Sequence, residues 1–372
     1  MIFPQPVLII FHGAVGDGPA ERLMARARVA AAGETAASAL AAGFEAVIIA
    51  TDDPHAFEPL PAGVLLDADD GEPFDFATRL RGIVQRYGLQ RPAVMGSGSV
   101  PLLGVPEFQL IAEQLAARDG RFVTNNFFSS DLTAWTPGCA IFEAGDFARD
   151  NVLPRRLRDN AGLAPVILPR TTETQFDLDT PADLAVLSLH ESLPAALRQV
   201  ALDAGLHTGS YRALMRFLVD RSAEVVVAGR VGSMTWQHLE RETACRVRMI
   251  SEERGLAASG PDHRPRSVLG FLLEALGPRR FFERMAELGD ALVLDTRVIE
   301  AHLGATPSRE DRFQSDLFAF EGIEDPFLRQ FTEAAANAPR PVLLGGHSLV
   351  AGGLMLLNDI AWRENDRRLG IA

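Results

Sequence analysis

One amino acid is missing from this chain: none of its 372 residues is lysine, so all 36 basic residues are arginine. This absence excludes a Schiff-base lysine, a P-loop lysine and a lysine general base. Cationic stabilisation must therefore come from arginine, from a metal ion or from the N-terminus of a helix. A GC-rich genome that favours arginine codons explains the bias and leaves the exclusion intact.

Cysteine is scarce as well. Cys139 and Cys245 lie far apart and have no metal-binding partner at close spacing, so we expect neither a zinc site nor a disulfide framework. The start, MIFPQPVLIIFHG, lacks the basic and long apolar segments of a signal peptide, and no apolar run is as long as a membrane span. These features predict a cytoplasmic protein without a membrane partner.

Positive charge is also in deficit, because 49 acidic residues outnumber the 36 arginines and the net charge is −13. Such a surface repels phosphate backbones, so we expect no nucleic-acid partner. A local arginine cluster still suits a single nucleotide or sugar phosphate. The sequence leaves the oligomeric state open, and an oligomer is compatible with it.

Short apolar runs alternate with helical stretches, which is typical of a largely parallel sheet covered on both faces. The expected strands cover residues 7–11, 46–51, 64–67, 93–96, 122–125, 165–168, 225–228, 246–250, 291–295 and 342–345. The expected helices include residues 33–42, 75–87, 106–118, 181–191, 267–276 and 325–336. We therefore predict an α/β protein with a three-layer, mostly parallel domain over residues 1–190, a helical connector over 191–222 and a second, open-sheet α/β domain over 223–372.

The segment FDLDTPADLAVL, residues 176–187, places two carboxylates just before a helix. Thr180 is expected to cap that helix and Pro181 to occupy its first turn. Asp177 and Asp179 are then placed to hold a divalent cation against a nucleotide phosphate, and we predict them as metal ligands and catalytic residues. The alternative is that Asp179 only caps and Asp177 is solvated.

This segment resembles the late DxDTPxDL motif of nucleotidyltransferases with the GT-A-like fold. Three upstream segments also resemble that family: GETAASALAAGFEAVIIATDDP (33–54), VMGSGSVPLLG (94–104) and FVTNNFFSSDLTAW (122–135). Within the family the sequence is most similar to guanylyltransferases that build phospholactate or molybdenum cofactors. The resemblance covers roughly the N-terminal half. It implies a nucleoside triphosphate substrate and Mg²⁺.

The first loop departs from the family pattern. The family grips the triphosphate with a glycine-rich loop that contains arginine and lysine, whereas this loop reads HGAVGDGPAERLMARAR, residues 12–28. The predicted phosphate-binding residues here are Gly13, Gly16, Gly18 and Arg22, and Arg26 and Arg28 are further sources of charge.

A second departure concerns the central turn. Ser97 and Ser99 are expected to contact the nucleotide, but Ser99 stands where the family has a metal-binding aspartate. A hydroxyl is a poorer ligand for a hard cation than a carboxylate.

Other polar residues follow expected strands. Asn125, Asn126 and Asp131 are predicted to line a pocket for the base or the acceptor, with capping as the alternative. Asp67, Asp69 and Asp70 fit a solvated turn better than a compensating metal site.

In the second half, EVVVAGRVGSMTW (224–236) has Gly229 and Gly232 at a strand–helix turn but lacks the third glycine of a dinucleotide fingerprint, which favours a packing turn. VLLGGHSLVAGG (342–353) resembles a nucleophile elbow. However, Val350 replaces the required glycine and no histidine follows His347.

The predicted second-domain candidates are His347 and Ser348, contacting a phosphate or a neighbouring loop, and a pair formed by Asp295 and Arg297 at a strand end. For the whole chain, we predict transfer of a nucleoside monophosphate from a triphosphate to a small phosphorylated or acidic acceptor, with release of pyrophosphate. The alternative is a catalytically degenerate scaffold that binds a nucleotide or sugar phosphate and acts through its C-terminal domain.

Overall fold

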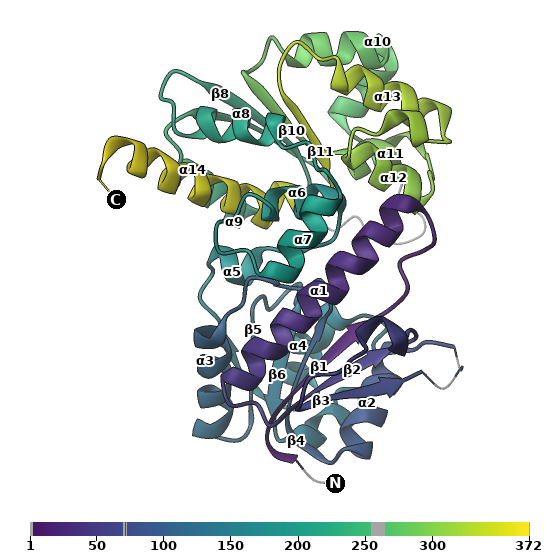
Figure 1. Cartoon of the computed structure of the whole chain (residues 1–372), viewed down its shortest axis with the longest axis vertical. Coiled ribbons are helices and arrows are strands. Elements are labelled where there is room, and N and C mark those ends of the chain that lie inside the picture. The colour runs from purple at the N-terminus through teal and green to yellow at the C-terminus, as the bar shows by residue number, and fades with distance from the viewer. Residues whose placement is uncertain (1–2, 70, 72, 254–264, 372) are drawn as a thin grey trace. The chain divides into compact units, whose positions relative to one another are not determined.

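The chain forms two compact units, each built around one β-sheet (Figure 1). The first unit comprises residues 1–15 and 25–175, and the second comprises residues 16–24 and 176–372. The structure is a computed structural model that describes residues 3–69, 71, 73–253 and 265–371. The segment predicted as a connector, residues 191–222, is helical, but its helices belong to the second unit, which resumes at Phe176.

The first unit contains a seven-stranded sheet with the order β3-β2-β1-β4-β6-β5-β7. Its strands are β1 (Phe3–His12), β2 (Ala46–Thr51), β3 (Val64–Ala68), β4 (Leu89–Gly96), β5 (Arg121–Thr124), β6 (Leu132–Thr136) and β7 (Ala164–Ile167). Its helices are α1 (Pro19–Ala41), which starts in the second unit, α2 (Phe76–Arg86), α3 (Val105–Ala117), α4 (Leu153–Asp159) and α5 (Thr172–Gln175). β6 runs antiparallel to β4 and β5, and the other described pairs are parallel.

Both faces of the first sheet are buried. Alternate residues of β1 point to opposite faces, so Ile9 packs in the same cluster as Leu80 of α2, whereas Ile10 packs with Ala36 of α1 and Phe108 of α3. A strand buried on both faces needs a continuous apolar run, which explains VLIIF. These contacts confirm the predicted three-layer arrangement.

The second unit contains a four-stranded parallel sheet with the order β11-β10-β8-β9. Its strands are β8 (Glu224–Gly229), β9 (Arg246–Ser251), β10 (Ala291–Asp295) and β11 (Val342–Gly345). Its helices are α6 (Pro181–Leu187), α7 (Ala195–Asp203), α8 (Gly209–Leu218), α9 (Ser233–Glu242), α10 (Val268–Met285), α11 (Thr296–Leu303), α12 (Arg309–Asp316), α13 (Pro326–Ala336) and α14 (Leu354–Leu369). The predicted open-sheet α/β architecture is confirmed.

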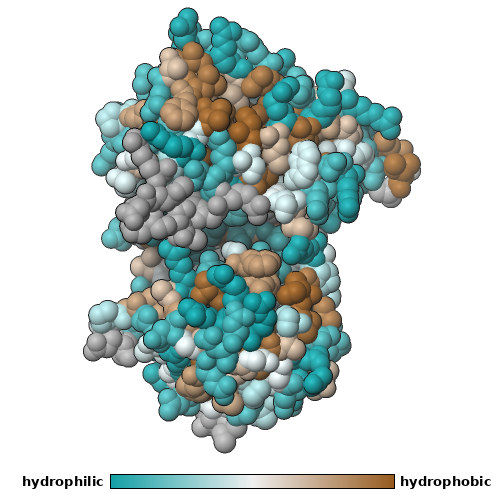
Figure 2. All heavy atoms as spheres, turned by 180° about the vertical axis from the view of Figure 1, so that it is seen from behind, coloured by the Kyte–Doolittle hydropathy of each residue, from teal (hydrophilic) through white to brown (hydrophobic). Residues whose placement is uncertain are grey.

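The core of this unit forms where helices cover the sheet. Val226 and Ala228 of β8 and Leu344 of β11 share one apolar cluster with Phe281 of α10 and Phe331 of α13. Large apolar side chains also reach the surface of the protein. On the face shown in Figure 2, hydrophobic residues form patches that are bordered by hydrophilic residues. Among the described residues, no helix is both long and apolar enough to cross a membrane.

Helix α6 ends at Leu187 rather than at residue 191, and strand β4 begins at Leu89 rather than at residue 93. Two further elements differ more from the prediction. Helix α1 begins at Pro19, well before residue 33, because alanine-rich sequence with Leu23 and Met24 buried continues the helix through the expected phosphate loop. Strand β6 was not predicted, because its residues follow an Asn-rich turn and only their pairing with β4 and β5 makes them a strand.

Candidate functional site

The strand order of the first sheet reverses between β1 and β4. The chain goes from β1 to β2 and β3 on one side and returns to β4 on the other. In open α/β sheets, ligands bind outside the carboxyl ends of the strands at such a switch point. Gly13 follows β1 directly, and Ser97 and Ser99 follow β4. The fold therefore brings three of the predicted residues to one place.

His12, the last residue of β1, joins them and was missed by the sequence analysis. Its side chain is buried, and its Nδ1 lies 3.0 Å from Oγ of Ser97. Burial, and then the charge of Arg28, lower the pKa of His12, so its imidazole is neutral at neutral pH. The backbone joins the same two strands, because the Ser97 amide donates to the Phe11 carbonyl at 2.9 Å. A polar residue that ends a buried strand is the signal that would have identified His12.

The turn after β4 holds an unusual backbone conformation. Val100 has a φ of 36° and is fully buried, and a β-branched residue is rarely found at positive φ. Ser99 stabilises the turn: its hydroxyl accepts from the Gly96 amide at 3.3 Å, and its amide donates to the Gly96 carbonyl at 3.1 Å. Backbone strain of this kind concentrates at binding and catalytic sites.

The predicted glycine loop is divided between the two units. Gly13 belongs to the first unit, whereas Gly16, Gly18 and Arg22 belong to the second. In the second unit the Gly18 amide donates to Glu21 at 3.0 Å, and the exposed Arg22 donates to the carbonyl of Asp17.

The start of α1 already has an anionic partner. The amides of Ala20 and Glu21 donate to the carboxylate of Glu310 on α12, at 3.0 to 3.1 Å. A helix N-terminus favours a negative group at this position, and the chain itself supplies one. A phosphate bound to these amides would therefore have to displace Glu310.

Asn125 has no hydrogen-bonding capacity left for a ligand. Its oxygen accepts from the amides of Asp131 and Leu132, each at 3.1 Å, and its nitrogen donates to Asp131 at 2.9 Å and to the Thr174 carbonyl at 3.0 Å. An amide side chain can make four such bonds. Asn125 thus positions Asp131, while the half-buried Asn126 closes a turn by accepting from the Phe128 amide.

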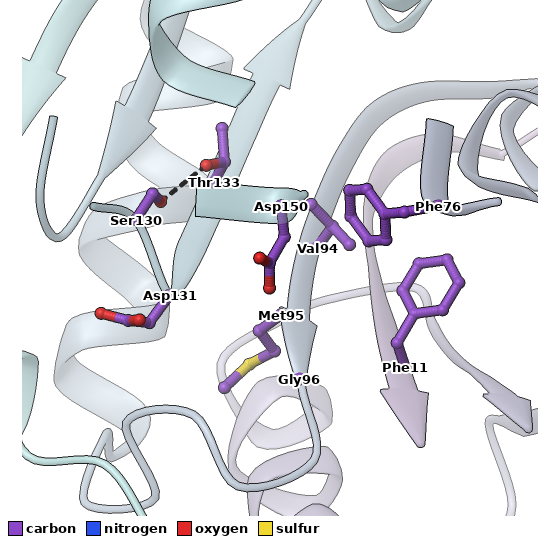
Figure 3. A pocket seen from close by; sticks show the side chains of 9 residues that line it. All are labelled: Phe11, Phe76, Val94, Met95, Gly96, Ser130, Asp131, Thr133 and Asp150. Atoms are coloured by element: carbon purple, nitrogen blue, oxygen red, sulfur yellow. Dashed lines mark hydrogen bonds between the residues drawn. The ribbon is translucent and has the colours of Figure 1, made fainter. Parts of the chain in front are cut away.

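Asp131 borders a small cavity at the carboxyl ends of the central strands β1 and β4 (Figure 3). The cavity is lined by Phe11, Phe76, Val94, Met95, Gly96, Ser130, Asp131, Thr133 and Asp150. Figure 3 shows the carboxylate of Asp131 pointing away from the two phenylalanines. The volume of about 20 Å³ holds about one water molecule, so a nucleotide base does not fit inside.

The solvated turn predicted after β3 is wrong for Asp67. This side chain is fully buried and forms ion pairs with Arg79 and, at 2.7 Å, with Arg86. The arginines on the following helix α2 explain why a carboxylate is buried there. Asp69 is exposed and pairs with Arg79 at 3.2 Å, and Asp70 lies outside the described residues.

The late motif lies wholly in the second unit. Thr180 is the N-cap of α6 and forms a capping box with Asp183, as its sequence pattern indicates. Asp183 is fully buried and also accepts from the hydroxyl of Ser348 at 2.5 Å. Burial, and then the charge of Asp179, raise the pKa of Asp183 to about 7. Asp179 itself is exposed and Asp177 is half-buried.

The donor set limits what a metal ion could do. Within the described ranges, no group of three histidine, cysteine, aspartate or glutamate side chains is placed to hold a metal. Mg²⁺ usually binds through one or two carboxylates together with substrate phosphates. Asp177 and Asp179, two positions apart, supply two carboxylates at the start of the late motif.

The predicted pair at the end of β10 has different partners. Asp295 binds Arg230, with Oδ2 2.6 Å from Nε and Oδ1 3.0 Å from Nη2. Arg297 instead pairs with the buried Asp316 of α12 through two bonds of 2.8 and 2.6 Å. Asp295 still receives the Arg297 amide at 3.3 Å, because it caps α11. The predicted Asp295–Arg297 side-chain pair is therefore corrected to two separate pairs.

The loop after β11 reaches the same edge of the second sheet. His347 is exposed, bonds to the Arg230 backbone and lies within electrostatic reach of Asp179 and Asp295. Ser348, in contrast, is buried and bonded to Asp183, so it is no exposed nucleophile.

Comparisons with known proteins find likeness only among solved structures. No protein-family model matches the chain, and no curated protein matches it. A cytidylyltransferase from Leptospira borgpetersenii is 14% identical, over 54% of this chain and 94% of its own, with a TM-score of 0.40. A nucleotidyl transferase from Methanothermobacter is 15% identical, over 46% and 90%, with a TM-score of 0.36. A CMP:2-keto-3-deoxy-manno-octonic acid synthetase complexed with CTP is 13% identical, over 54% and 99%, with a TM-score of 0.33. About half of the chain is thus similar to nucleotidyltransferases, at scores that assign it no activity.

The hydrogen bonds of the two asparagines predict unequal effects. Asn125→Ala leaves several buried polar groups without partners and should lower the free energy of unfolding by about 3 kcal/mol. Asn126→Ala removes only the turn contacts to the amides of Phe128 and Ser129, at a half-buried position, and should cost about 1 kcal/mol. Urea unfolding followed by circular dichroism measures both values, and equal costs would contradict the structural role given to Asn125.

The raised pKa of Asp183 predicts that the stability of the folded protein depends on pH. Because its pKa is raised from 3.8 to about 7 in the folded state, the folded protein binds a proton that the unfolded chain releases. Its contribution is therefore most favourable at or below about pH 4 and is lost as the pH rises to about 7. Between pH 5 and 8, wild type should lose stability relative to Asp183→Asn, which cannot titrate. If the thermal-unfolding midpoints of wild type and Asp183→Asn change in parallel with pH, the raised pKa of Asp183 is contradicted.

Proposed function

We propose that the protein binds a nucleoside triphosphate at the carboxyl edge of its first sheet and transfers the nucleoside monophosphate to a small phosphorylated or acidic acceptor. The observation that carries this proposal is the convergence of Gly13, His12 and Ser97 on the β1/β4 switch point. These positions are where an open α/β sheet accepts ligands. The resemblance of four sequence segments to nucleotidyltransferases supports the same assignment.

Electrostatics decide which residues handle the phosphates. The chain has no lysine, so arginine must supply the positive charge, and Arg28 is the arginine whose charge reaches His12. The loop after β1 is held beside β2, because the Ala14 amide donates a hydrogen bond to the Asp52 carboxylate at 3.1 Å. Gly13 is exposed there without a side chain to obstruct a ligand. Arg28 would neutralise phosphate charge beside this loop.

In the proposed reaction, an oxygen of the acceptor attacks the α-phosphorus. The bond from that phosphorus to the bridging oxygen breaks, and pyrophosphate leaves with the electron pair. Such chemistry needs in-line positioning and charge neutralisation more than covalent catalysis. The Ser97 hydroxyl, fixed by the neutral His12, offers one preorganised hydrogen bond to an oxygen of the triphosphate. Asp177 and Asp179, which belong to the second unit, are proposed as Mg²⁺ ligands.

A second candidate, a nucleotide-binding scaffold without catalysis, is favoured by two observations. Glu310 already occupies the start of α1, where the family's phosphate loop would act. The Ser99 hydroxyl is used in its own turn and stands where the family has a carboxylate. A scaffold would bind nucleotide without releasing pyrophosphate.

The two candidates differ in a measurement on the full chain. The four common nucleoside triphosphates are titrated by calorimetry and thermal shift, with Mg²⁺ or with a chelator, and pyrophosphate release is assayed with phosphorylated and acidic acceptors. The enzyme predicts Mg²⁺-dependent stabilisation, about 2.7 kcal/mol at a hundredfold excess over Kd, together with pyrophosphate. If the nucleotide stabilises the protein equally with and without Mg²⁺ and no pyrophosphate is released, the scaffold is favoured.

Ser97→Ala tests the site itself. Removing the hydroxyl that faces His12 should weaken triphosphate binding by about tenfold, which corresponds to one lost hydrogen bond to a charged group. Ser129→Ala, an exposed serine on the Asn-rich turn, is the matched control and should bind as wild type does. Absence of triphosphate binding by wild type, or equal binding by Ser97→Ala, would refute the proposal.

A further inference from the structure

The second sheet has a switch point of its own. From β8 the chain goes to β9 on one side and then to β10 and β11 on the other, so the order reverses between β8 and β10. Three loops meet at this edge: one after β8 that contains Arg230, one after β10 that starts at Asp295, and one after β11 that contains His347. The same topological rule that points to the first site applies here.

Gly229 makes the contact across this switch point possible. It has a φ of 128°, and a Cβ at this position would overlap with the side chain of Asp295. Without that Cβ, the Asp295 carboxylate crosses the end of β8 and receives both the amide of Arg230, at 3.3 Å, and its guanidinium. Any larger residue at 229 would break this pair.

Asp295 and Arg230 have different exposures. The Asp295 side chain is 0% exposed and takes four hydrogen bonds, from Arg230 and from the Arg297 amide. The Arg230 side chain is 20% exposed and uses Nε and Nη2 in the pair, so Nη1 is not part of it. The buried carboxylate thus orients an arginine that remains partly exposed. A buried ion pair is a poor means of gaining stability, because desolvation offsets most of the attraction.

Two further groups lie beside Arg230, namely His347 and the start of α9, and the exposed Asp179 lies within electrostatic reach of His347. His347, exposed on the β11 loop, bonds to the Arg230 backbone. Helix α9 begins two residues after Val231 and has Gly232 as its N-cap, with no side chain capping it. Arginine and helix amides together bind planar or tetrahedral oxyanions.

We propose that the second unit has its own ligand site at the β8/β10 switch point, which binds the phosphate or carboxylate group of a small molecule with Arg230 as the cationic anchor and Asp295 as its positioning residue. This site is built from residues of the second unit alone, and its test uses no nucleotide and does not depend on the function proposed above.

Two variants of the full chain remove different parts of the site. Arg230→Lys keeps the charge but loses the fork that Asp295 orients. Ser233→Pro removes the first amide hydrogen of α9 at a helix position that tolerates proline, and Gly232 before it already has the extended conformation (φ −82°, ψ 157°) that proline requires. The second variant leaves the ion pair intact, so it reports on the site even if Arg230→Lys folds poorly.

Two matched control variants change the same residue types without altering the proposed site. Ser233→Ala retains the amide hydrogen. Arg340→Lys alters an arginine that pairs with Asp290 at 3.5 Å at the amino end of the same sheet. Both controls should bind as wild type does.

The probes are orthophosphate and malonate, titrated by calorimetry and thermal shift without nucleotide. We expect wild type and both controls to bind at least one probe, and the preferred probe identifies phosphate or carboxylate as the ligand group. Arg230→Lys and Ser233→Pro should each weaken binding by about tenfold or more. The proposal is overturned if wild type binds neither probe, or if both variants bind as tightly as the controls.

Discussion

The parallel pairing of β1 with β2 on one side and with β4 on the other is the constraint on which the first unit depends. β1 is buried on both faces, and its register places His12 opposite Thr51 while Ser97 follows β4. Crossover helices must then leave on opposite faces of the sheet, so the loops diverge and leave space at the carboxyl ends. The buried polar groups at this edge, His12 and Ser97, are thus positioned by the apolar strands that they terminate or follow.

The second unit repeats this arrangement with fewer strands, and each unit holds a buried carboxylate that pairs with arginine. The Asp295 carboxylate is placed by β10, by the missing side chain of Gly229 and by the start of α11. In the first unit, Asp67 is buried between Arg79 and Arg86 at the end of β3. Each pair fixes an arginine at a strand end, and arginine is the only basic side chain in this sequence with a permanent charge.

Much of the fold could be predicted from the sequence, because its strands are short apolar runs between turn residues. Residues 46–51 and 291–295 were predicted to the residue. The site was less predictable, because local patterns do not tell which partners a polar side chain finds. The sequence predicts that Asn125 binds a ligand, but in the structure its side chain forms all four of its hydrogen bonds within the protein. The sequence places Arg230 in a packing turn, and only the fold shows that Asp295, far along the chain, lies beside it.

Hydrogen exchange of the full chain, with and without a saturating Mg²⁺–nucleoside triphosphate, tests the central claim that the β1/β4 switch point of the first unit is the nucleotide site. Amide hydrogens exchange with solvent more slowly where a bound ligand suppresses local opening of the structure. The account predicts slowed exchange in residues 12–15 and 96–100, with the amino ends of the first sheet unchanged. Protection that spares both loops, while the bound nucleotide protects other segments, would contradict it.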